Sequence, residues 1–209
     1  MSTPPIASPS NPTVASRKLT LHDITDVRAY ERERTERRAE VLALKQRRRV
    51  NLGTILAVAF ENRITMRHQI QEMARVEKLV TDEAIQEELD IYNPMVPEPG
   101  QLCATVFLEL TNDDQMREWL PKLVGIERSL VFQLPGGEQV RSVTEAQHES
   151  QLTREHITAA VHYVRFNFTP EQVADFYGSV RLRADHPSYL EETELLPATI
   201  DELRLDLIP

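Results

Sequence analysis

The chain has 209 residues, of which 41% are hydrophobic and 27% charged, so we predict a globular protein with a core of its own. A single cysteine, Cys103, excludes an intramolecular disulfide and any zinc or iron–sulfur centre held by several cysteines. The net charge of −9 argues against a uniformly basic, nucleic-acid-binding surface, and no apolar run approaches the ~20 residues of a membrane-spanning helix.

The N-terminal segment is predicted to be a disordered tail over residues 1–17. Its first 16 residues contain four prolines, four serines and no charge. They lack the basic start and apolar run of a secretory signal, so we expect a cytoplasmic protein. Residues 18–209 are predicted to form a single domain, with a sub-boundary in the proline-rich loop 93–100.

The first half of this domain is predicted to be mainly helical. A capping-box pattern at residues 20–23 opens a short helix, and residues 26–46, without Gly or Pro, favour a long one. Residues 50–60 alternate apolar and smaller side chains, which is typical of a buried strand. Further helices are predicted over 64–80 and 81–92.

The second half is predicted to mix strands and helices. Strands are expected over 102–110, 159–168 and 180–185, a hairpin over 131–143, and helices over 112–123, 169–177 and 197–205. Residues 144–155 are polar and are expected to be mobile. The fold class is therefore α+β, with a mixed sheet, a long N-terminal helix and several packed helices.

Charge is unevenly distributed along the chain. Residues 17–49 carry eleven Lys or Arg and six Asp or Glu, a balance of +5, and residues 50–209 carry 13 minus 27, or −14. The basic segment is expected to dock on the acidic body, on a second copy in a homo-oligomer, or on an acidic partner. Nucleic-acid binding through residues 47–49 is disfavoured, because three arginines make a weak, salt-sensitive contact.

Several short blocks together resemble one bacterial family. They are Phe60–Arg63, Gln69–Met73, Thr105–Glu109, His162–Phe166 and Asp185–Tyr189. The family is a domain of unknown function, often encoded beside rubrerythrin-like proteins and a heterodisulfide-reductase-like iron–sulfur protein, and the resemblance covers about residues 18–207. It implies an accessory role in a redox or peroxide-defence system, with a redox protein as partner, and carries no specific activity.

The residues Glu61, Asn62 and Arg63 lie where the predicted strand meets a helix. Rigid elements on both sides would hold these side chains as ligand contacts. The alternative is that Asn62 caps the helix and Glu61 pairs with Arg63. Both interpretations stay open from the sequence.

One face of the helix that follows carries Glu61, Thr65, His68 and Glu72, at i, i+4, i+7 and i+11. A glutamate and a histidine one turn apart can bind a divalent metal or act as acid and base. A solvated face with an i,i+4 contact is the simpler interpretation. Glu72 lies nearer the apolar boundary than His68 and is the better candidate.

The strand at 159–168 places His162 on the face of Val164 and Phe166, and Arg165 on the opposite face. His162 is therefore either a hydrogen-bonded core residue or a ligand. Arg165 is a ligand-binding candidate, and we predict that it forms a buried pair with Glu72.

A second histidine, His186, precedes Pro187, which favours extended or turn geometry. Asp185 either orients His186, as the second shell of a metal site would, or bonds its own backbone in a turn.

Together, His162, His186, Glu61 and Glu72 could form a two-histidine, carboxylate site for a divalent metal, iron or zinc. Nothing in their spacing brings them together. Two functional hypotheses follow: an accessory or interaction protein, or a metal- or small-ligand-binding protein with a His/Glu site between strands 50–60 and 159–168.

Overall fold

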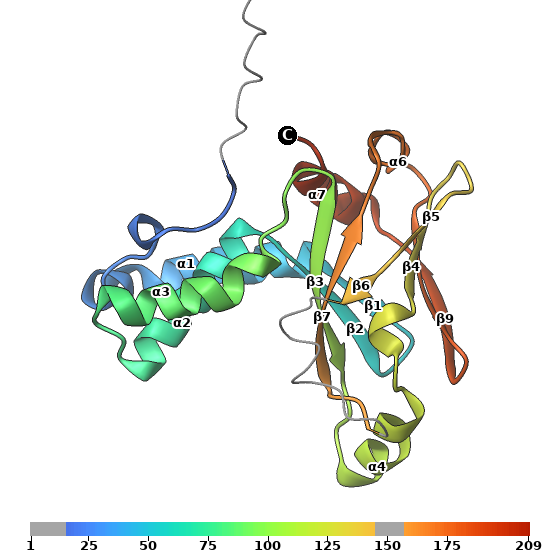
Figure 1. Cartoon of the computed structure of the whole chain (residues 1–209), viewed down its shortest axis with the longest axis horizontal. Helices are drawn as coiled ribbons and strands as arrows, with labels where there is room; N and C mark the ends of the chain where they lie inside the picture. The colour runs from blue at the N-terminus through green and yellow to red at the C-terminus, as the bar shows by residue number, and fades with distance from the viewer. Residues whose placement is uncertain (1–15, 145–156) are drawn as a thin grey trace, which may run out of the picture.

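The computed structural model describes residues 16–144 and 157–209. Helices α1 (Val27–Arg47), α2 (Arg63–Glu77) and α3 (Asp82–Tyr92) pack side by side, next to two β-sheets (Figure 1). The predicted long helix is confirmed, and Asp26 caps it by accepting bonds from the Arg28 and Ala29 N–H groups. The predicted tail and residues 145–156 lie outside the described residues, apart from Ser16 and Arg17.

The first sheet has the order β1-β2-β3-β7-β6, and every pairing in it is antiparallel. The prediction of one strand over 50–60 is wrong, because Gly53 turns the chain with φ +64 and makes a hairpin of β1 and β2. The strands are β1 (Arg49–Leu52), β2 (Leu56–Glu61), β3 (Gln101–Leu108), β6 (Val143–Thr144) and β7 (Val161–Asn167).

The second sheet has the order β5-β4-β8-β9 and is also antiparallel throughout. The sequence predicted the β4–β5 hairpin and β8 but missed β9, because its polar run of glutamates lacks the alternation of a half-buried strand. The strands are β4 (Leu130–Gln133), β5 (Gln139–Arg141), β8 (Arg181–His186) and β9 (Tyr189–Glu194). The α+β class is confirmed, and the expected mixed sheet proves to be two antiparallel ones.

The remaining helical elements begin near their predicted positions. Thr81 caps α3, Asn112 caps α4, and Thr169 opens α6 with a capping box. Helix α2 ends at Glu77, before Val80, which is 85% exposed. The other elements are η1 (Leu21–Asp23), η2 (Asn93–Met95), α4 (Asp113–Lys122), η3 (Ile126–Arg128), α6 (Pro170–Ala174) and α7 (Pro197–Leu207).

The first sheet is covered on both faces. Leu102, Ala104 and Val106 of β3 face the second sheet in the larger core, whereas Cys103 belongs to a smaller cluster with Met66 and Ile70 of α2. Phenylalanines fill the centre of the larger core, and burial of each such ring stabilises the fold by about 1.5–3 kcal/mol. They are Phe60, Phe132, Phe166, Phe168 and Phe176. On the helix side of this sheet, the polar residues Glu61 of β2 and Thr105 of β3 are buried.

Within the described part of the chain, no helix combines the length and apolarity needed to cross a membrane.

Candidate functional site

A polar cluster centred on Glu72 joins α1 to α2. Tyr30 Oη donates to Glu72 Oε1 at 2.7 Å, and Arg34 binds both carboxylate oxygens, at 2.8 and 2.9 Å. Arg75 Nη2 adds a longer bond of 3.3 Å. The hydrogen bonds from Arg34, opposed by burial, lower the pKa of Glu72 to about 2. Glu72 is therefore ionised at neutral pH and acts only as an acceptor.

The same cluster determines which nitrogen of His68 carries a proton. Tyr30 Oη lies 3.3 Å from His68 Nδ1, and its own hydrogen is committed to Glu72. The phenol oxygen can then only accept, so Nδ1 is the donor and Nε2 keeps its lone pair. Burial lowers the pKa of His68, the largest influence, and keeps the ring neutral. His68 thus offers a hydrogen-bond acceptor at Nε2.

A groove of about 260 Å³ lies between α1 and α2 beside this cluster. Arg67 lines it and has no hydrogen-bond or ion-pair partner among the described residues; His68 Nε2 has none there either. The groove is lined by Tyr30, Arg37, Glu40, Val41, Ile64, Arg67, His68 and Gln71. It combines one unpaired cation, Arg67, one carboxylate, Glu40, one neutral acceptor and apolar walls.

The strand-to-helix junction predicted as a ligand site is a structural joint. Asn62 Oδ1 accepts from the N–H groups of Ile64 and Thr65, both at 3.0 Å, while Thr65 Oγ1 accepts from Asn62 N. The capping interpretation is thus confirmed for Asn62. The proposed Glu61–Arg63 pair is wrong, because Arg63 instead binds Asp23 Oδ1 at 2.6 Å.

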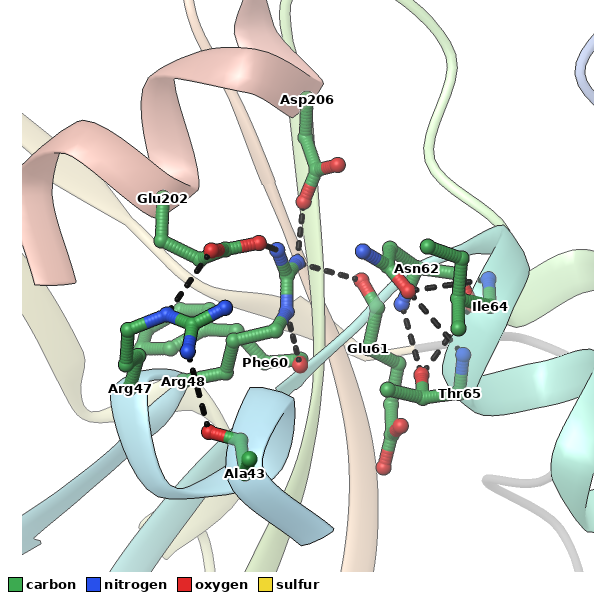
Figure 2. Close-up of polar contacts among 10 residues, drawn as sticks. All are labelled: Ala43, Arg47, Arg48, Phe60, Glu61, Asn62, Ile64, Thr65, Glu202 and Asp206. Atoms are coloured by element: carbon green, nitrogen blue, oxygen red, sulfur yellow. Dashed lines mark hydrogen bonds and ion pairs between the residues drawn. The ribbon is translucent and has the colours of Figure 1, made fainter. Parts of the chain in front are cut away.

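Arg48 lies between the β2–α2 junction and α7, as Figure 2 shows. Its side chain is 1% exposed, and it donates to the carbonyl oxygens of Phe60 and Glu61, at 2.9 and 3.2 Å. It also binds the carboxylates of Asp206 and Glu202 on α7. The residues 47–49, considered for nucleic acid, therefore include a buried arginine that ties α7 to the β2–α2 junction.

The Glu61 side chain points away from Arg48 (Figure 2) and lies under the helices. It is 5% exposed, and Oε1 accepts from Thr105 Oγ1 at 2.8 Å. Its other oxygen, Oε2, is buried without a hydrogen-bond partner in the described structure. Cross-strand register places Cys103 beside Glu61 and Arg165 beside Cys103, so Glu61 and Arg165 share this face.

His162 occupies the opposite face of the same sheet. Its Nε2 lies 2.9 Å from both Ala159 O and Thr158 Oγ1, and since a carbonyl only accepts, Nε2 carries the proton. Its Nδ1 lies 3.9 Å from the buried Oε2 of Glu127, too far for a direct hydrogen bond. Burial lowers the pKa of His162 and outweighs the attraction of Glu127. The core interpretation of His162 fits these contacts.

His186 ends β8 and is also engaged at both ring nitrogens. Its Nε2 lies 3.0 Å from Val124 O, and its Nδ1 accepts from Ser188 N at 3.2 Å. Neither interpretation of Asp185 holds, because its carboxylate binds Arg141 Nη2 at 2.8 Å instead. His186 therefore closes the β8–β9 turn.

The structure does not bring His162, His186, Glu61 and Glu72 together. His162 and Glu61 lie on opposite faces of the first sheet, Glu72 is bound by arginines, and both nitrogens of His186 have other partners. Among the described residues, no group of three or more His, Cys, Asp or Glu is placed to hold a metal ion. Strand alternation and separate elements thus keep the four named residues apart, and binding of iron or zinc stays a prediction.

The predicted Glu72–Arg165 pair is also wrong. Glu72 is bound by Arg34 and Arg75, whereas Arg165 Nη2 donates to Pro94 O at 3.2 Å. Of the candidates weighed from the sequence, His68 lines the groove and Glu72 lies beside it, bonded to Tyr30.

The comparisons with known proteins place the chain in a family of unknown function. A family model described as "Protein of unknown function (DUF3501)" matches residues 18–207. The chain belongs to the DUF3501 family. A crystal structure of a novel protein of unknown function from Burkholderia pseudomallei K96243 is 33% identical, with a TM-score of 0.84, and the match covers 91% of this chain and 99% of that one. A search of curated proteins finds no match.

In this DUF3501 chain, sequence reasoning missed the α1 side of the groove. Neither Tyr30 nor Arg34 was among the candidate residues. Their spacing of four residues places both on one face of the predicted helix, and this could have marked them as a pair. Arg67 carried no signal, because one arginine on an amphipathic helix is ordinary.

Proposed function

We propose that this protein binds a small ligand in the groove between α1 and α2. The observation that carries the proposal is His68, whose Nδ1 is occupied by Tyr30 and whose Nε2 is left as an acceptor. The Tyr30–Glu72–Arg34 contacts hold the imidazole in one tautomer, as a preorganised binding site requires. Concave sites with apolar walls and a few oriented polar groups are typical of ligand pockets.

Other hollows on the described surface support ligand binding less well. One is lined by Arg17, Arg63 and Asp206, but each of these side chains is committed to a bond within the chain. Another, beside Gly100 and Phe168, is lined by prolines and apolar residues without a charged side chain. Of these three hollows in the described structure, the groove beside His68 has both an unpaired cation and an oriented acceptor.

A fragment-binding experiment with matched tryptophan variants tests this proposal. Ile64 lines the groove and is 56% exposed, whereas Leu42, on the outer side of α1, is 47% exposed. Ile64→Trp should fill the groove and Leu42→Trp should leave it open, with little effect of either on the core. A library that contains neutral and charged fragments is titrated into each protein, and binding is followed by ¹H–¹⁵N NMR.

The expected result is that fragments shift the resonances of Tyr30, His68 and Gln71 in the wild type and in Leu42→Trp, and that Ile64→Trp abolishes those shifts. Shifts that are equal in both variants, or that are scattered over the surface, would refute a ligand site in this groove.

We also propose, as the second candidate, that the protein is an accessory protein of a cytoplasmic redox or peroxide-defence system. The family resemblance and the +5/−14 charge division support this role. Arg28, Arg32 and Arg38 of α1 have no partner among the described residues, so the helix can face an acidic surface. Native mass spectrometry tests for a homo-oligomer, and titration with a purified rubrerythrin-like protein tests the partner. Binding that survives Arg28→Glu with Arg32→Glu would contradict docking through this helix.

A further inference from the structure

We infer that the groove takes a small organic acid that carries a hydroxyl or amine donor separate from its acidic group. This inference rests on the proposed function, because it names the ligand class of the same groove. Three properties of the lining support it: the charge, the single oriented acceptor, and the apolar walls.

The charge around the groove favours an anion. Arg67 in the lining is unpaired, and so are Arg38 and Lys45 of α1 among the described residues. Lys45, Arg34 and Arg38 all act on His68 as nearby positive charges, against the single negative charge of Glu72. Glu40 is the one carboxylate in the lining, and Arg37, also in the lining, is paired with Glu33 at 2.5 Å. A ligand carboxylate would therefore meet Arg67, whose planar guanidinium can bind it through two bonds.

The acceptor at His68 requires a donor on the ligand. Nδ1 donates to Tyr30, so a ligand atom opposite Nε2 must supply a hydrogen. An ion without a donor, such as sulfate, would place oxygen lone pairs against that of Nε2. A metal cation would meet one nitrogen ligand within a cationic surround, which is unfavourable.

The apolar walls and the volume of the groove limit the size and polarity of the ligand. Val41, Ile64 and the Tyr30 ring provide apolar contact between the two polar ends. At about 30 Å³ for each water-sized group, the groove holds roughly nine such groups, which is the size of a substituted benzoate. The ligand class is thus a compact acid with an apolar body and one separate donor.

Matched probes distinguish the three properties. The hydroxy acids are 3- and 4-hydroxybenzoate, benzoate lacks the donor, and 4-hydroxybenzamide lacks the charge. Dissociation constants are measured by NMR titration with full-length protein. We expect the better hydroxy acid to bind about tenfold or more tightly than either control, since an unpaired buried polar group weakens binding by about that factor.

Two variants test which residue binds each end of the ligand. His68→Gln should reduce the advantage of the hydroxy acid over benzoate and leave the affinity for benzoate within about twofold. Arg67→Gln should remove the advantage of the acid over the amide and preserve that of the hydroxyl. Melting curves confirm that each variant is folded, and His68→Asn serves as a second variant if His68→Gln is not.

The outcomes separate this inference from the proposed function. If neutral fragments bind in a manner blocked by Ile64→Trp, but benzoate or the amide binds as tightly as the hydroxy acids, the ligand class is wrong and the groove remains a site. If no probe and no fragment binds there, both conclusions fall.

Discussion

Tyr30 of α1 donates a 2.7 Å hydrogen bond to Glu72 of α2, and the same phenol oxygen lies 3.3 Å from His68. One hydroxyl group thus joins two helices and orients the imidazole beside the groove. Burial, then its hydrogen bond to Glu72, raises the pKa of Tyr30, so the phenol stays protonated as this arrangement requires.

Glu72 should make the protein sensitive to acid. Its pKa in the folded state, about 2, lies below the ordinary value of 4.5, so an unfolded chain takes up this proton more readily. The stabilisation is complete above pH 4.5 and is lost as the pH falls towards 2; a difference of this size corresponds to about 3 kcal/mol. Urea unfolding of wild type and Glu72→Gln between pH 6 and 2.5 measures it. Equal pH slopes in the two proteins would contradict the assignment.

Arg48 and Arg47 are adjacent but should differ sharply in their contribution to stability. Arg48→Met leaves the carboxylates of Glu202 and Asp206 without their buried partner and should reduce the free energy of unfolding by about 3–5 kcal/mol. Arg47→Met removes a half-exposed contact with Glu202 and should reduce it by less than about 1 kcal/mol. Both values come from denaturant unfolding. Losses of similar size would show that Arg48 does not hold the junction.

Gly53 should resist substitution for two separate reasons. Its φ of +64 disfavours a side chain, and a Cβ there would lie 2.4 Å from Tyr189 Oη, which donates to Leu52 O. Gly178, at φ +67, has nothing within 4 Å and provides the control. Gly178→Ala should cost about 1 kcal/mol, and Gly53→Ala at least about 1 kcal/mol more. Thermal melting compares them, and equal melting temperatures would contradict the steric contribution.

His162 should titrate below its ordinary pKa of 6.5, because burial disfavours the charged ring. A lowered folded-state pKa means that its contribution to stability is complete above pH 6.5 and is lost as the pH falls towards the folded pKa. NMR titration of the ring should show a neutral, Nε2-protonated imidazole at pH 7. Glu127→Gln should lower the pKa further by removing a nearby negative charge. A rise in that variant would show that Glu127 does not act on the ring.

Local patterns in the sequence were enough to predict most elements. Capping residues marked the starts of α3, α4 and α6, and periodicity separated helices from most strands. Alternation also placed His162 and Arg165 on opposite faces of β7. These features depend on neighbouring residues, so they can be read from the chain. The hairpin at Gly53 and the strand β9 were missed, because the first depends on one left-handed glycine and the second on pairing with β8.

The candidate site could be predicted only in part. Glu72 was identified from its position on one helix face, but its partners Tyr30 and Arg34 come from another helix, 42 and 38 residues away. The same limit explains the metal hypothesis: Glu61 and His162 lie on opposite faces of the first sheet, Glu72 lies on α2, and His186 lies in the second sheet. The sequence determined the class, several helix caps and the faces of the side chains of β7. Only tertiary packing decided which faces meet, because side-chain contacts between elements depend on their arrangement in space, which local spacing does not encode.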